Sequence, residues 1–75
     1  MKSMTCKELG GACDQVFTAD TFDQIAALSK QHGREMYAKK DAAHLAAMQA
    51  MLELMHDPEA LSRWMAEKRA TFEGR

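Results

Sequence analysis

The sequence predicts a small α+β fold in which a two-stranded β-hairpin packs against three α-helices. Residues 2–19 hold two short stretches of alternating polar and apolar residues separated by a Gly-Gly pair, the pattern of a hairpin. Three amphipathic stretches follow, at about 21–39, 41–56 and 58–73. The chain has 75 residues without an internal repeat or a linker. The order ββααα is therefore expected to form one small domain over residues 1–75.

The hairpin is predicted from two strand-like stretches, residues 2–6 and 13–19. The glycines at 10–11 supply the turn between them, because glycine accepts positive φ angles without strain. The connection between the strands is then six residues long. This arrangement predicts that Cys6 and Cys13 face each other at the closed end of the hairpin.

Each helix is predicted to begin at a recognisable cap. Thr21 and Gln24 fit a capping box, in which each side chain accepts a hydrogen bond from a backbone N–H at the helix start. Asp41 is suited to cap the second helix. Asp57 followed by Pro58 is typical of the start of a third helix, because proline is accepted at the first helical position.

Composition and charge exclude several functional classes. Ten basic and eleven acidic residues give a net charge of −1, so we expect no nucleic-acid partner and no membrane association. No apolar stretch approaches the roughly 20 residues of a membrane span, and the first six residues are too polar to open a signal peptide. We therefore expect a cytoplasmic protein. There the two cysteines are metal ligands or free thiols, and a disulfide is the alternative for an exported domain.

Cys6, Cys13 and His32 are the candidate metal ligands. From Cys13 the predicted strand runs outward for about 20 Å, and the first helix returns for about 16 Å before it reaches His32. The two lengths nearly cancel, so His32 is expected level with both cysteines. Thiolates and a neutral imidazole are ligands that zinc prefers. The alternative is that the cysteines are small buried apolar residues and the histidine is a hydrogen-bonded core residue.

Three segments of the chain carry recognisable motifs, namely TCKELGGACD at 5–14, TFDQI at 21–25 and QHG at 31–33. Together they resemble a known bacterial family, the domain of unknown function 1059, whose members are described as predicted small metal-binding proteins. The resemblance implies a cytosolic metal-binding domain with Cys6, Cys13 and His32 as ligands. Many members carry a second histidine four residues after the first, where this chain has Met36. The family implies no established biochemical activity.

The fourth ligand has two main candidates. His44 is expected in the first turn of a second helix that doubles back, which brings it near the height of Met36 on the first helix. An imidazole there would complete a zinc site. Met36 lies one turn after His32 on the same face, and its thioether would favour Cu(I) over zinc. Asp14 or a water molecule are further alternatives.

Gly33 interrupts the first helix beside His32, at an expected cost of about 1 kcal/mol relative to alanine. It either lets the hairpin backbone approach the site closely or only relieves crowding there.

The methionines favour a packing surface. Met48, Met51 and Met55 recur at helical spacing, which fits a core or an interface better than a copper-handling face. If three helices leave part of this stripe uncovered, we expect a homodimer or another protein partner on the helical face.

We expect no enzymatic activity. The sequence contains no Gly-rich phosphate loop, no His-Glu-x-x-His motif and no Cys-x-x-Cys motif, and Glu35 lies off the helix face of His32. The function predicted is that of a small interaction module with a structural zinc that joins hairpin to helix. The alternative is a carrier or sensor that exchanges zinc or Cu(I) at an incomplete site.

Overall fold

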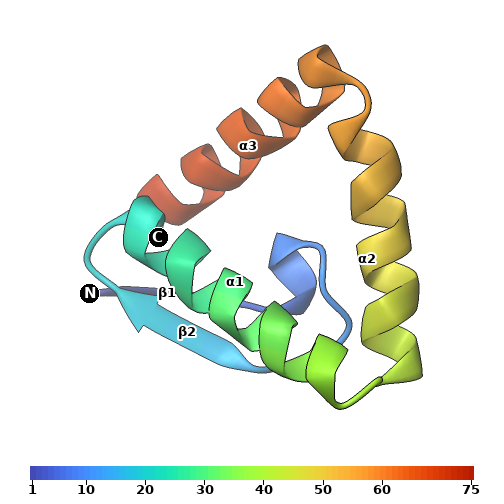
Figure 1. Ribbon diagram of the computed structural model, residues 1–75. Coiled ribbons are helices and arrows are strands. Elements are labelled where there is room, and N and C mark those ends of the chain that lie inside the picture. The colour runs from blue at the N-terminus through green and yellow to red at the C-terminus, as the bar shows by residue number, and fades with distance from the viewer.

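The computed structural model describes residues 1–75 and confirms the α+β class, with a two-stranded antiparallel sheet and three helices packed together (Figure 1). The elements in chain order are β1 (Lys2–Thr5), the 3-10 helix η1 (Lys7–Leu9), β2 (Val16–Ala19), α1 (Phe22–Ala38), α2 (Ala42–Met55) and α3 (Pro58–Glu73). In Figure 1 the three α-helices form a triangular frame, the sheet lies along α1, and η1 lies inside the frame.

The sheet pairs β1 with β2 so that Met4 stands opposite Phe17 and Ser3 opposite Thr18. Met4 and Phe17 are buried, whereas the hydroxyl groups of Ser3 and Thr18 share a hydrogen bond of 2.9 Å on the outer face. This division is the one that the alternating sequence predicts, because successive side chains of a strand point to opposite faces.

The predicted strand bounds, 2–6 and 13–19, were wrong at the closed end of the hairpin. The strands end at Thr5 and resume only at Val16, so both cysteines lie in the connection and not in the strands. This connection folds on itself, because the N–H of Cys6 donates to the carbonyl of Gln15 (2.8 Å) and the N–H of Lys7 donates to the carbonyl of Cys13 (3.0 Å). Non-ladder hydrogen bonds therefore replace the expected six-residue turn.

The predicted helix caps are present. Thr21 and Gln24 form a complete capping box at the start of α1, and the Asp41 carboxylate accepts a hydrogen bond from the N–H of His44 in α2. Asp57 accepts from two N–H groups of the first turn of α3, where Pro58 is the first helical residue. Because cap residues have extended backbone, α1 and α2 begin one residue later than the stretches predicted at 21–39 and 41–56.

The core lies between the sheet, η1 and α1. Eight hydrophobic residues are buried, namely Met4, Cys6, Leu9, Phe17, Ala19, Phe22, Ile25 and Phe72. From α3 only Phe72 belongs to this set, and its ring meets the Phe22 ring edge-on at 6.0 Å. Helix α2 contributes none of the eight. It packs against α1 and α3, and its one buried residue, His44, belongs to the site described next.

No helix combines the length and the apolar composition that crossing a membrane requires.

Candidate metal centre

Four side chains from four segments converge beside the core. Cys6 follows β1, Cys13 lies in the connection before β2, His32 lies within α1, and His44 lies in the first turn of α2. The two sulfur atoms and one ring nitrogen of each histidine all lie within 4.8 Å of one another. Cys6 and His44 are buried, and Cys13 and His32 are half-buried. The cluster therefore has a covered side and an accessible side.

The spacing fits tetrahedral coordination. The Cys13 Sγ lies 3.3 Å from the His32 Nε2, and the Cys6 Sγ lies 3.6 Å from the His44 Nε2. In a tetrahedral zinc site, bonds of about 2.3 Å to sulfur and about 2.0 Å to nitrogen place such a pair about 3.5 Å apart. The two imidazole rings meet edge-on with centroids 5.3 Å apart, so both can point a nitrogen at a common centre. The four residues can hold a metal ion such as zinc.

The connection between the strands positions the first cysteine. The carbonyl of Cys6 accepts hydrogen bonds from the N–H groups of Leu9 (3.1 Å) and Gly11 (2.8 Å), which winds the chain around the thiol. Gly10 closes the 3-10 turn with a φ of 90°, a left-handed conformation that glycine adopts without strain. A Cβ at position 11 would overlap the Cys6 sulfur. The Gly-Gly pair thus serves the site as well as the turn.

His44 is oriented by Asp41. The His44 Nδ1 lies 2.6 Å from the Asp41 Oδ2, and the same oxygen accepts the N–H of His44 at 3.0 Å. A proton on Nδ1 donates to this carboxylate, which leaves the lone pair of Nε2 directed toward the cysteines. Such a carboxylate–histidine pair is the usual outer support of a histidine metal ligand. From the sequence, Asp41 is predicted only as a helix cap; its three-residue spacing from His44 was the signal for the second role.

The two thiols have different environments. The backbone N–H of Gln15 and the His44 side chain lower the pKa of Cys13, while burial raises the pKa of Cys6. The hydrogen bond with the Asp41 carboxylate raises the pKa of His44, and the pKa of Asp41 is lowered in turn. In the metal-free protein Cys13 is therefore the first of the two thiols to ionise. A metal ion must displace the protons that Cys6 and His44 hold.

The structure brings one of the candidates for the fourth position, His44, into the cluster. His44 joins the two cysteines and His32, and the exposed carboxylate of Asp14 does not belong to the cluster. Met36 is half-buried, further along α1. Both cysteines are free, so the alternative of a disulfide does not apply to this structure.

Gly33 does not open a close approach to the site. A Cβ added there would have the Met48 Cε as its nearest neighbour, at the ordinary contact distance of 3.9 Å. No backbone of the hairpin lies within contact of that position, so the first of the two interpretations of Gly33 is not supported.

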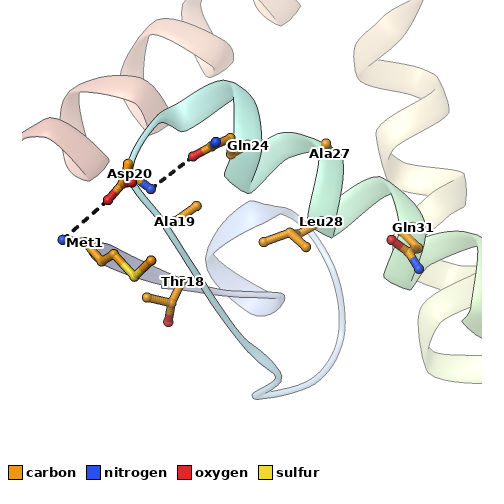
Figure 2. A pocket seen from close by; sticks show the side chains of 8 residues that line it. All are labelled: Met1, Thr18, Ala19, Asp20, Gln24, Ala27, Leu28 and Gln31. Carbon is orange, nitrogen blue, oxygen red and sulfur yellow. Dashed lines mark hydrogen bonds and ion pairs between the residues drawn. The ribbon is translucent and has the colours of Figure 1, made fainter.

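A separate hollow of about 430 Å³ lies where β2 leads into α1 (Figure 2). At its edge the N–H of Asp20 donates to the side-chain oxygen of Gln24 (3.1 Å), and the Asp20 carboxylate lies 3.7 Å from the amino group of Met1. The lining contains neither cysteine nor histidine, so this hollow is distinct from the cluster.

Comparisons of this chain with family models, curated proteins and solved structures find no match. The resemblance to the domain of unknown function 1059 therefore stays a prediction that rests on the segments quoted above.

Proposed function

We propose that this protein is a small zinc-binding module in which one structural ion joins the hairpin to α1 and α2. The observation that supports the proposal most is the convergence of two thiols and two imidazoles from four separate segments. Two sulfur and two nitrogen donors suit zinc, whereas calcium and magnesium require oxygen donors. The family resemblance supports the same conclusion from the sequence.

A structural role follows from how α2 is held. His44 is the one buried residue of α2, so coordination of its imidazole would be the principal anchor of that helix. A core of eight hydrophobic residues is small, and domains of this size commonly gain stability from a metal ion. Four protein ligands leave no coordination position for substrate or water, so we propose no catalytic role. The module would act by presenting its helical surface to a partner.

Native mass spectrometry of freshly purified protein tests the assignment, because it reports the metal and its stoichiometry together. We expect one zinc per chain, and release of protons when zinc is added to the metal-free form. Cys6→Ser should lose zinc and His44→Ala should bind it more weakly, whereas His56→Ala is the matched control, because His56 ends α2 and lies outside the cluster. A metal-free protein whose melting is unchanged by zinc or chelator would contradict the proposal.

A metal carrier is the second candidate, and one observation favours it. Cys13 and His32 are half-exposed, and a surface hollow of about 340 Å³ borders His32. Such access would allow a competing ligand to reach the ion. Chelator exchange separates the candidates: a structural site releases zinc slowly, and His44→Ala should speed that release while Met36→Leu leaves it unchanged. Preferential loading with Cu(I), reversed by Met36→Leu, would support the carrier instead.

A further inference from the structure

Helix α2 is apolar on every side yet mostly uncovered. Glu53 is its single acidic or basic residue apart from His44, and its other positions are alanine, leucine and methionine with one glutamine. Helices that are apolar all round are normally buried. Here only His44 is buried, and large side chains such as Leu52 and Met55 are 51% and 53% exposed. The exposed apolar side chains of this helix would be expected to pack against another molecule.

Two apolar hollows flank α2. The first, of about 430 Å³, lies between α1, α2 and α3, and its lining includes Ala26 of α1, Met51 and Met55 of α2, and Leu61, Trp64 and Met65 of α3. The second, of about 320 Å³, is lined by Tyr37, Met48, Met51, Leu52 and Met55. Met51 and Met55 line both hollows. They therefore form a wall between the two, and we call the whole area the α2 surface.

The exposed area is larger than a chain of this mass requires. The accessible surface is 5105 Å² for 8.4 kDa, whereas a compact monomer of that mass exposes about 4,600 Å². The excess of about 500 Å² approaches the area of about 600 Å² that each partner contributes to a small stable interface. The α2 surface is lined almost wholly by apolar side chains and lacks the convergent polar groups that orient a small ligand.

We propose that the α2 surface is the interface of a homodimer, in which a second copy of this chain covers it. A two-fold interface requires one patch to complement itself. The α2 surface can do so, because the exposed apolar side chains of Leu52 and Met55 lie beside two hollows that are themselves apolar. The half-exposed Met55 of each copy would lie in a hollow of the other copy, near Trp64. Methionine is adaptable at such contacts, and tryptophan is enriched among residues that dominate binding energy.

Sedimentation equilibrium of the zinc-loaded protein tests the dimer directly. We expect a dimer mass for the wild type and, for Met55→Glu, a dissociation constant raised about tenfold or more, because a charge would be desolvated in an apolar hollow. Met55→Leu should retain the dimer. The matched control is Ala46→Glu, which adds the same charge at an exposed position on the opposite side of α2. Trp64 is the one tryptophan, so its emission should shift to shorter wavelength as the dimer forms.

Zinc content and circular dichroism are recorded on the same samples. A dimer that survives Met55→Glu, or that Ala46→Glu breaks equally, would overturn the proposed interface. A wild type that remains monomeric with its zinc bound would overturn the dimer, and would leave the zinc assignment intact. A protein that forms dimers but binds no zinc would overturn the zinc assignment and would leave the dimer intact.

Discussion

Two glycines near the cluster have opposite surroundings. At Gly11 an added Cβ would overlap the Cys6 sulfur and lie 3.0 Å from the Cys6 carbonyl oxygen. At Gly33 the same atom would meet only the Met48 Cε at 3.9 Å, and no strained φ is present there. Position 11 is thus closed to any side chain, whereas position 33 has room for one.

Alanine substitutions should therefore change stability in opposite directions. Gly33→Ala should raise the free energy of unfolding by about 1 kcal/mol, because glycine within a helix is that much less favourable than alanine. Gly11→Ala should lower it by about 1–3 kcal/mol and weaken zinc binding, because the Cys6 thiol must move. Urea unfolding of the zinc-loaded variants measures both effects. Destabilisation by Gly33→Ala would show that the contact with Met48 is tighter than described.

Asp41 combines two roles that one substitution separates. Asp41→Asn should preserve the helix cap, since asparagine is an equally good cap residue, but it removes the carboxylate from His44. We expect zinc affinity to fall about tenfold at neutral pH. The carboxylate raises the pKa of His44, so His44 in the variant is protonated only at lower pH and the difference in affinity should shrink as the pH falls.

Competition with a chromophoric zinc chelator over a range of pH provides this measurement. Asp57→Asn is the matched control, because Asp57 caps α3 in the same way and lies outside the cluster. Equal affinity loss in both variants would mean that helix capping, and not the support of His44, causes the change.

At the scale of elements, the end of α3 is fastened to the hairpin and to η1. The Arg75 guanidinium donates to the carbonyl of Ser3 (2.7 Å) and pairs with the Glu8 carboxylate, and Lys2 Nζ donates to the carbonyl of Glu73 (2.7 Å). Glu8 also accepts the N–H of Thr5 at 2.9 Å. These contacts tie elements from opposite ends of the sequence, so η1 is held on both sides.

The Glu8 contact makes stability depend on acid pH. Arg75 lowers the pKa of Glu8 from 4.5 to about 2 in the folded protein. Because the pKa of Glu8 is lower in the folded protein than in the unfolded chain, its ionised carboxylate stabilises the fold fully above the unfolded pKa of 4.5. This contribution is lost as the pH falls toward 2. Glu8→Gln should therefore cost about 1 kcal/mol or less near neutral pH, since the pair is partly exposed, and the difference should vanish in acid.

Denaturant unfolding of both proteins from about pH 6 to about pH 2 checks this expectation. The contribution of zinc changes with pH in both proteins alike, so it cancels in the comparison. Glu67→Gln on the exposed side of α3 serves as the control and should show no such dependence. A constant difference at every pH would contradict the assigned role of Glu8.

For the whole molecule, the proposed zinc ion would link the part that has a core to the part that lacks one. The buried hydrophobic residues lie in segments from β1 to α1, with Phe72 as the single contribution of α3. Helix α2 meets this core through His44. Removal of the ion should therefore release α2 first.

Chelation should lower the melting temperature by about 10–20 °C relative to protein in zinc 100-fold above its dissociation constant. At this excess, a ligand that binds only the folded state contributes about 2.7 kcal/mol, which corresponds to such a shift in melting temperature for a domain of this length. Circular dichroism on heating, with and without chelator, provides the measurement. Cys6→Ser should melt at one temperature in both conditions, and a wild type that behaves in the same way would contradict a structural role.

The local features of this fold could be predicted from the sequence alone. The caps at Thr21, Asp41 and Asp57 and the alternation around Met4 and Phe17 depend on hydrogen bonds and side-chain directions within a few residues, so they are readable from neighbours. The chemistry of the candidate site was readable too, because the chain has only two cysteines and three histidines.

Tertiary packing decided the rest. Alternation at residues 13–15 resembles a strand, yet these residues form none. The carbonyls of Cys13 and Gln15 accept hydrogen bonds from the N–H groups of Lys7 and Cys6 within the connection, outside the strand ladder. The sequence left His44 and Met36 open, since the distance between two helices depends on how they cross and not on their spacing along the chain. The uncovered side of α2 was likewise undetermined, because a stripe of methionines has the same pattern whether one copy of the chain or two enclose it.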